Sequence, residues 1–403
     1  MQVRQASSRI GAVAFNGDDR RKAGQSGSVG MRGVAVTIER EKVEKAADEL
    51  AGLAADAVEP NPFFSPPLLR PALRLLASED VKPVIVRDSG GEPIAFAPMR
   101  PIRGYSRLPV RYAATWMHDH CFFAAPLIRR GCEQAAFGGL FAAADHLGAF
   151  LRLAALDADG ALAAAAARVA MEEHRKTSLS GAYQRAMLRG GFNAEATLNA
   201  ALPGKKRKEL RRQMNRLGDI GPVAFETLLP GGPLDLWTDK FLTLEASGWK
   251  GREGTALASR PEHAAFLRDA VRRAHEAKTL QFCQLSCGET TVAMIINFIE
   301  RGAAYSFKIA FDEAYARYSP GVLLEIELLK SLALRTDLAF IDSCAQPDHP
   351  MIDSIWRERR TIVALNVSRR DIASKALFDL LTSLERAAEI SRKRGKPTSR
   401  SAS

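Results

Sequence analysis

The chain has 403 residues, of which 46% are hydrophobic and 26% are charged, so it is long enough for two globular domains and apolar enough to bury them. It has no run of eighteen apolar residues, and its N-terminal region lacks the apolar stretch of a secretory signal, so we expect no membrane span and a cytoplasmic location. The net charge of +11 favours an anionic ligand or partner.

The five cysteines favour neither a disulfide framework nor a zinc site. They are odd in number and stand among apolar neighbours, which is typical of reduced, mostly buried thiols. Cys283 and Cys287 are four residues apart, but no second Cys or His pair at zinc-site spacing accompanies them. We therefore predict no metal.

Residues 34–195 are expected to form the first domain, after a disordered segment over residues 1–33. A helix over about 36–57 leads into Asn61-Pro62-Phe63-Phe64-Ser65-Pro66, where Ser65 can cap a second helix and Pro66 suits its first position. Apolar runs on either side of a glycine turn then predict a hairpin over residues 81–99. An Ala-rich part follows, with helices and a short strand near Leu151, and Gly190-Gly191 ends it.

A basic helix is predicted over residues 196–220 and connects the two domains. Lys205-Lys206-Arg207-Lys208 is continued by further arginines, and Leu210, Met214 and Leu217 recur among them at helical spacing. The basic face of this helix is either a solvated surface or a contact for RNA, an acidic membrane or the phosphates of a cofactor.

Residues 221–370 are expected to form the second domain, followed by a C-terminal helix and a basic disordered tail over 371–403. A hairpin is predicted around Cys287-Gly288-Glu289, and the alternating residues Tyr305–Phe311 predict a third strand. This hairpin is similar to the one around residue 91, which indicates a weak internal duplication and hence two similar domains in tandem.

The third strand leads to Ser319-Pro320-Gly321 and an amphipathic helix. Ser319 can cap this helix, Pro320 suits its first position, and Gly321 lets the backbone approach a ligand. The free N–H groups and the positive dipole end of such a helix can hold a phosphate.

Several short motifs together resemble those of the CelD/BcsL-type acyltransferases of the GNAT superfamily, which are distantly similar to FemAB-type aminoacyltransferases. The resemblance covers residues 55–368 and rests on the order and spacing of motifs that are individually unremarkable. They are Leu244–Arg252, Gly254–Leu257, Phe307-Lys308, Asp312, Tyr315, Ser319-Pro320-Gly321, Asp342, Trp356, Asn61–Pro66 and the basic helix.

This resemblance implies an α/β (α+β) fold of two tandem GNAT-like domains, each a mixed, mainly antiparallel sheet flanked by helices. It also implies transfer of an acyl group from acyl-CoA, either acetyl-CoA or a longer thioester, to an amine or hydroxyl. The acceptor would be a small molecule or a saccharide, and the family's name points to polysaccharide or envelope biosynthesis. The cofactor pyrophosphate would lie at Ser319, Pro320, Gly321 and Val322, although the GNAT loop usually carries a second glycine that this chain lacks.

The sequence predicts direct attack in a ternary complex, because it shows no Gly-x-Ser-x-Gly elbow and no triad spacing. Asp342 ends an apolar strand. Its carboxylate either contacts the substrate and acts as the general base, or caps the loop that follows the strand. His349 has a pKa suited to base work and is otherwise a loop-surface residue. Lys250 is a candidate contact for the acyl carbonyl or for an anionic acceptor. Cys344 is predicted to be a buried side chain rather than a nucleophile.

Substrate contacts are predicted at Trp249, Lys308, Asp312 and Tyr315. Trp249 either stacks against a bound substrate or packs in the core. Lys308 should point away from Tyr305, Phe307, Ile309 and Phe311, and needs a carboxylate or a phosphate as its partner. Trp116–Cys121, with His118 and His120, is expected to be a polar loop at the acceptor site rather than a metal site.

Two other functions stay open from the sequence. One is an aminoacyl-tRNA-dependent transferase, in which the basic helix contacts RNA and binding weakens steeply with salt. The other is a non-catalytic binding protein that has kept the fold, which is favoured if Asp342 and His349 lie far from any cleft. Neither the identity of the acceptor nor the oligomeric state follows from the sequence.

Overall fold

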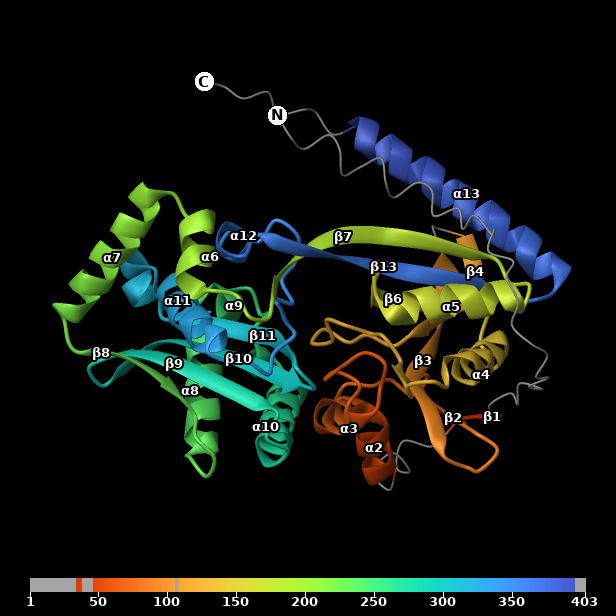
Figure 1. The fold of residues 1–403 in the computed structure, drawn as a ribbon, viewed down its shortest axis with the longest axis horizontal. Coiled ribbons are helices and arrows are strands. Elements are labelled where there is room, and N and C mark those ends of the chain that lie inside the picture. The colour runs from red at the N-terminus through yellow and green to blue at the C-terminus, as the bar shows by residue number, and fades with distance from the viewer. Residues whose placement is uncertain (1–33, 38–45, 106–107, 396–403) are drawn as a thin grey trace, which may run out of the picture. The chain divides into compact units, whose positions relative to one another are not determined.

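The structure is a computed structural model that describes residues 34–37, 46–105 and 108–395 (Figure 1). The predicted disordered segment 1–33 and the last residues of the basic tail lie outside this part of the chain. None of the described helices is long and apolar enough to cross a membrane.

Thirteen strands of the described chain form one continuous sheet in the order β1-β2-β3-β4-β6-β13-β7-β12-β11-β10-β9-β8, and β5 pairs with β3 at the side. Among the described strand pairs, only β4–β6 and β11–β12 are parallel. The strands are β1 (Val34–Thr37), β2 (Lys82–Arg87), β3 (Pro93–Tyr105), β4 (Leu108–Thr115), β5 (Leu127–Ile128), β6 (Phe150–Asp157), β7 (Thr177–Arg189), β8 (Val223–Thr227), β9 (Leu280–Cys287), β10 (Thr290–Glu300), β11 (Ala303–Phe311), β12 (Phe340–Asp342) and β13 (Glu358–Ser368).

Helices cover the sheet on both faces (Figure 1). They are α2 (Ala47–Ala55), α3 (Pro66–Leu75), α4 (Glu133–Asp145), α5 (Ala161–Glu172), α6 (Ala194–Ala201), α7 (Gly204–Gly218), α8 (Leu234–Ser247), α9 (Trp249–Arg252), η1 (Leu257–Ser259), α10 (Pro261–Glu276), η2 (Glu313–Tyr318), α11 (Pro320–Ala333), α12 (Ile352–Ile355) and α13 (Ile372–Gly395). In the second half, alternate strand residues divide between two cores. Phe282 and Ile296 pack in the core that includes α8 and α10, whereas Cys283 and Ile295 pack in the core that includes α11.

The two halves of the chain repeat one arrangement, in which a hairpin and a third strand lead through a helix to a strand parallel to the third. In the first half these are β2–β3, β4, α4 and β6, and in the second half they are β9–β10, β11, α11 and β12. The mixed, mainly antiparallel sheet with flanking helices that the sequence predicts is confirmed.

The halves exchange strands in the middle of the sheet. β7 precedes the second half in sequence but pairs with β12, and β13 follows β12 in sequence but pairs with β6 (Figure 1). β7 and β13 also pair with each other, from Thr177–Val367 to Met187–Glu358. The expected pair of separate sheets is therefore joined into one.

Local predictions fail at four places. Val34–Thr37 is a strand paired with β2 and does not belong to a helix. Ser65 lies at the start of α3, but its hydroxyl donates to Asn61 O and Glu300 Oε1 and does not cap the helix. The tail remains helical to Gly395. A bulge at Phe307, opposite Ile296 and Asn297, breaks the predicted alternation of β11. The sequence pattern did not indicate it, because local interactions do not specify such an extra residue.

Candidate functional site

The parallel strands β11 and β12 separate after three residue pairs. Ala303, Ala304 and Tyr305 pair with Phe340, Ile341 and Asp342, and no described backbone hydrogen bond joins the two segments beyond this point. β11 continues to Phe311, so one edge of its last residues has no strand partner. The Ile309 carbonyl on this stretch accepts a hydrogen bond from Lys250 Nζ at 3.3 Å.

The helix α11 begins directly beside this divergence. Pro320 occupies its first position and is buried with Gly321, as the sequence predicts. A Cβ atom added to Gly321 would lie 3.6 Å from Phe311, 3.7 Å from Met351 and 3.9 Å from Ile309. Gly321 therefore packs against the end of β11 and against Met351, which follows β12, and the first turn of α11 leaves free N–H groups at the helix N-terminus.

Ser319 does not cap α11, which corrects the prediction from sequence. Its backbone is left-handed, with φ of 54°, and its side chain makes no capping hydrogen bond. The Ser319 carbonyl instead accepts from Val322 N at 2.9 Å and Leu323 N at 3.0 Å. In the described chain this leaves the Gly321 N–H without a backbone or side-chain acceptor, available to an anion at the positive end of the helix dipole.

Asp312 and Tyr315 shape the connection between β11 and α11. The Asp312 carboxylate accepts from Ala314 N at 2.9 Å and so caps η2. Tyr315 packs against Tyr318, with ring centroids 6.4 Å apart. Asp312 is thus occupied by the backbone, and its predicted role as a substrate contact stays a prediction.

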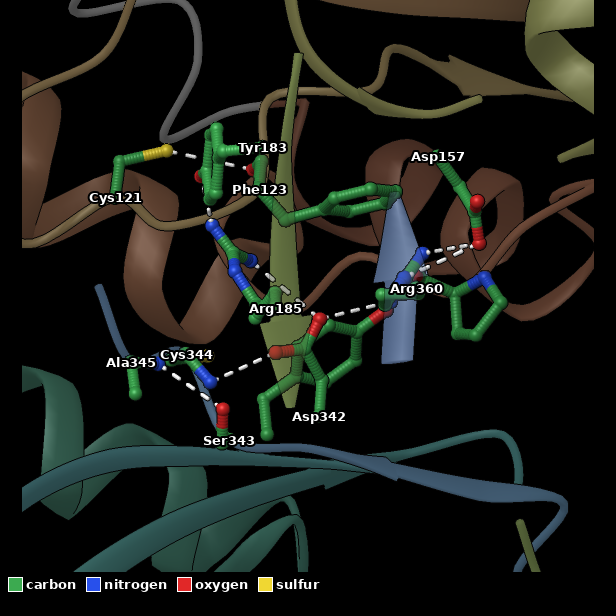
Figure 2. A network of polar contacts seen from close by, with 12 residues as sticks. Cys121, Phe123, Asp157, Tyr183, Arg185, Asp342, Ser343, Cys344, Ala345 and Arg360 are labelled. Carbon is green, nitrogen blue, oxygen red and sulfur yellow. Dashed lines mark hydrogen bonds and ion pairs between the residues drawn. The ribbon is translucent and has the colours of Figure 1, made fainter. Parts of the chain in front are cut away.

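Asp342 lies at the centre of a buried ion-pair network (Figure 2). It is 0% exposed, and its Oδ2 accepts from Arg360 Nη1 at 2.8 Å and from Arg185 Nη1 at 3.4 Å. Its Oδ1 accepts from Cys344 N at 2.7 Å. Of the two roles that the sequence left open, the Asp342 carboxylate therefore caps the loop that follows β12. Both of its oxygens already accept hydrogen bonds, whereas a general base needs an oxygen that is free to take the proton of the substrate.

Arg360 ties Asp342 to the first half of the chain. Its other guanidinium nitrogens bind Asp157 Oδ2, from Nε at 3.1 Å and from Nη2 at 2.9 Å (Figure 2). Burial by itself would lower the pKa of Arg360, but Asp342, Tyr305 and Asp157 together more than offset burial, so the pKa is raised. Arg185 also donates to Tyr183 Oη at 2.5 Å. Sequence analysis missed Arg185 and Arg360, which come from β7 and β13 and not from the strand that carries Asp342.

Lys250 and Trp249 lie on the short helix α9, next to β11. Lys250 Nζ donates to Glu245 Oε1 at 3.0 Å, while Glu245 Oε2 accepts from Leu257 N at 2.8 Å. Glu245 is buried, so Lys250 has a fixed carboxylate partner that sequence analysis missed. Trp249 is 47% exposed, which argues against its alternative as a core residue.

Lys308 lies in a polar cluster formed by both halves. Its Nζ lies 5.7 Å from the centroid of the Phe307 ring. The pKa of Lys308 is lowered to about 8, mainly by burial and also by Lys250, while Glu245 and Asp119 oppose the shift. Neither of the protein carboxylates suggested by the sequence, Asp312 and Asp342, forms an ion pair with Lys308 in the described structure.

Histidines from both halves complete this cluster. His120 Nε2 and His263 Nδ1 are 3.1 Å apart, and His118 Nδ1 accepts from His120 N at 3.2 Å. Burial lowers the pKa of His118 to about 3 and that of His120 to about 2, so both imidazoles are neutral at pH 7. His263, on α10, was missed by sequence analysis because its partner lies in the other half. No group of three or more His, Cys, Asp or Glu residues in the described chain could hold a metal ion.

His349 follows β12 on the other side of the divergence. It is half-buried, its Nδ1 accepts from Ile352 N at 3.3 Å, and burial lowers its pKa, as does Lys250. Asp353 opposes this shift. The structure thus brings Lys250, Lys308 and the histidines to the diverging strands, with Asp342 buried behind them.

In the first half, the strands that correspond to β11 and β12 are β4 and β6, and hydrogen bonds continue to bridge the segments that follow their last residue pair. β4 and β6 pair only through Ala113–Leu151 and Ala114–Arg152. Beyond these pairs, Thr115 Oγ1 accepts from Ala154 N at 2.9 Å and Ala124 N donates to Ala155 O at 3.3 Å. The first turn of α4 carries Glu133, which disfavours an anion there. Within the described residues, only the second half therefore presents a pair of parallel strands that separate without a bridging hydrogen bond.

Residues 204–348 match the family model described as an acetyltransferase (GNAT) domain. No curated protein matches the chain. Among solved structures, FemX is similar with 9% identity and a TM-score of 0.53, over 86% of this chain and 99% of that one. L-PGS from Bacillus licheniformis is similar with 13% identity and a TM-score of 0.50, over 85% of this chain and 96% of that one. These likenesses establish the fold over both halves.

Proposed function

We propose that this protein transfers an acyl group from acyl-CoA to an amine or hydroxyl acceptor by direct attack in a ternary complex. The observation that carries the proposal is the separation of β11 and β12 after Tyr305 and Asp342, with the start of α11 facing the two diverging segments. The GNAT-type domain over residues 204–348 supports the same reaction class.

The residues around the divergence fit an acyl-CoA. The unpaired edge of β11 offers backbone groups to the amides of an extended donor. The Gly321 N–H and the dipole of α11 suit its pyrophosphate, and the absence of a side chain on Gly321 allows close approach. Ser319 and Val322 hold this turn through their mutual backbone hydrogen bond.

In the proposed reaction the acceptor's nitrogen or oxygen attacks the thioester carbonyl, and its proton passes to Lys308. A C–N or C–O bond forms, the C–S bond breaks, and CoA leaves as the thiol. Lys308 is suited to this step because a pKa of about 8 leaves a substantial fraction as free amine near neutral pH. Lys250, held by Glu245 at the Ile309 carbonyl, is a cation beside the place where negative charge develops.

The acceptor is proposed to lie against the cluster formed by both halves and the exposed face of Trp249. Neutral imidazoles at His118 and His120 can exchange hydrogen bonds with hydroxyl or amine groups, and an indole face suits the apolar face of a sugar ring. A small-molecule or saccharide acceptor, as in polysaccharide or envelope biosynthesis, fits these surroundings.

The proposal is tested by measuring thiol release from acetyl-CoA and longer acyl-CoAs with a panel of amines and saccharides. We expect release that depends on the acceptor, with no acyl-enzyme visible by mass spectrometry. Lys308→Met should abolish release and Lys330→Met, at an exposed position on α11, should not. An acylated protein, or release that does not need an acceptor, would contradict direct attack.

A second donor, aminoacyl-tRNA, is favoured by the position of the basic helix. α7 lies against η2, which directly precedes α11, and Gln213 Nε2 donates to Arg317 O at 3.2 Å. Its side chains Lys205, Lys206, Lys208, Arg211 and Arg216 are exposed. A polyanionic donor that occupies α11 could therefore extend onto α7.

A further inference from the structure

A hollow of about 390 Å³ lies on β3 and β4 in the first half of the chain, and three of its lining residues are arginines. Its lining consists of Asp80, Arg100, Pro101, Ile102, Arg103 and Arg111. Arg103 and Arg111 stand directly opposite each other in the register of the two strands. The hollow is at the beginning of β4, whereas the histidine and lysine cluster follows the end of that strand.

The described residues do not neutralise the charge of this hollow. No described residue forms an ion pair or a hydrogen bond with the side chains of Arg100, Arg103 or Arg111. The lining contains one carboxylate, Asp80, which is exposed and accepts a hydrogen bond from Ser78 Oγ. Like charges directly opposite each other on neighbouring strands repel, so the pair Arg103–Arg111 costs stability in the free protein.

A bound anion would remove this repulsion. Guanidinium groups bind phosphate through two parallel hydrogen bonds, and two opposed arginines can hold a phosphoryl group from both sides. The volume falls within the range of small-ligand sites, about 300–1,000 Å³. A phosphoryl group has enough oxygens to bind both arginines of the pair at once, whereas a carboxylate has only two oxygens.

We propose that this hollow is a second binding site, separate from the transfer site, that takes a phosphoryl group. The group belongs either to a soluble phosphate ester or diphosphate or to the headgroup of an anionic phospholipid. The site does not depend on the proposed acyl transfer, since none of its residues contributes to the divergence of β11 and β12.

Calorimetry with sodium pyrophosphate, combined with hydrogen exchange, tests the site. Pyrophosphate should protect peptides covering residues 99–112, and this separates the hollow from binding at α11, which would protect peptides covering 303–325. Arg103→Gln and Arg111→Gln should each weaken binding at the hollow roughly tenfold to a hundredfold. Arg168→Gln, which removes the same charge from an exposed position on α5, should leave binding unchanged.

Thermal melting supplies a second readout. Because each Arg-to-Gln change removes one member of a repelling pair, the free variants should melt at the temperature of the wild type or above it. A purely structural role for either arginine would instead lower the melting temperature.

Vesicles of phosphatidylcholine, with or without phosphatidylglycerol, distinguish the two sources. Sedimentation with the anionic vesicles that requires Arg103 and Arg111 would assign a lipid phosphate. Pyrophosphate binding without vesicle binding would assign a soluble phosphate. The proposal is overturned if both variants bind pyrophosphate and vesicles as the wild type does, or if neither probe protects residues 99–112.

Discussion

Tyr305 and Asp342 form the last residue pair between the parallel strands β11 and β12. The side chain of Asp342 accepts hydrogen bonds from Arg360 and Arg185, and Arg360 also donates to Asp157 on β6. The point at which the strands separate is therefore held by a buried ion-pair network that involves both halves of the chain.

Asp342→Asn should destabilise the protein because it leaves two buried guanidinium groups without their common partner. We expect a loss of about 3–5 kcal/mol in the free energy of unfolding, measured by urea denaturation. Asp239→Asn, which breaks the exposed pair with Arg268, should cost no more than about 1 kcal/mol. Wild-type stability combined with lost transfer activity would mean that Asp342 is the general base after all.

Lys308 should give the transfer reaction its pH dependence. Only the free amine accepts a proton, so kcat/KM should rise with pH through about 8 and then level off. Lys308→Arg should lower kcat about a hundredfold or more, since an arginine stays protonated throughout this range.

The matched change Lys330→Arg should leave both the rate and the pH profile unchanged. If Lys308→Arg keeps its activity, or if the rate falls as the pH rises through 8, then Lys308 acts as a cation and not as a base.

Glu325 should make the protein less stable as the pH rises from 4.5 to 7. Burial in α11 raises the pKa of Glu325 to about 7, which the neighbouring Trp356 indole opposes. Between the unfolded and folded pKa values the folded protein holds a proton that the unfolded chain has lost, so stability falls as the pH rises.

Glu325→Gln removes this dependence and should exceed the wild type in unfolding free energy by roughly 2–3 kcal/mol at pH 8, with no such gain below pH 4.5. Parallel urea titrations at the two pH values measure the difference. An equal effect of the substitution at both values would contradict the assigned titration.

The identity of the donor should be visible in the salt dependence of binding. Acetyl-CoA makes few phosphate contacts, so its Kd should change less than about tenfold between 50 and 200 mM salt, whereas an RNA held over six to ten phosphates loses about 10³–10⁵ in affinity. Replacing Lys205, Lys206 and Lys208 with Gln should leave the acetyl-CoA affinity within about threefold. A large loss of acetyl-CoA affinity in this triple variant would mean that α7 itself contacts the phosphates of the cofactor.

Local sequence patterns predicted the elements that surround the site. The alternation in Tyr305–Phe311, the Pro320-Gly321 helix start and the helical spacing of the basic segment each depend on neighbours along the chain, and β11, α11 and α7 confirm them. The arrangement of the site depended on distant partners. Arg360 at Asp342, His263 at His120 and Glu245 at Lys250 come from other elements, and no local pattern marks such pairs.

Backbone detail explains the remaining differences. The left-handed conformation of Ser319 prevents its hydroxyl from capping α11, and the bulge at Phe307 changes which face Lys308 occupies. The exchange of β7 and β13 between the halves could not be predicted either, because each strand has the same apolar pattern whichever sheet edge it joins.

The binding of acetyl-CoA at the start of α11 is the central claim, and calorimetry on the wild type and Gly321→Glu tests it most directly. A glutamate at this position would place a negative charge and a side chain between Ile309, Phe311 and Met351. Gly52→Glu, at an open position on α2, is the matched control. We expect one acetyl-CoA per chain for the wild type and the control, and at least about tenfold weaker binding for Gly321→Glu. Equal binding by all three proteins, or binding by none of them, would contradict the account.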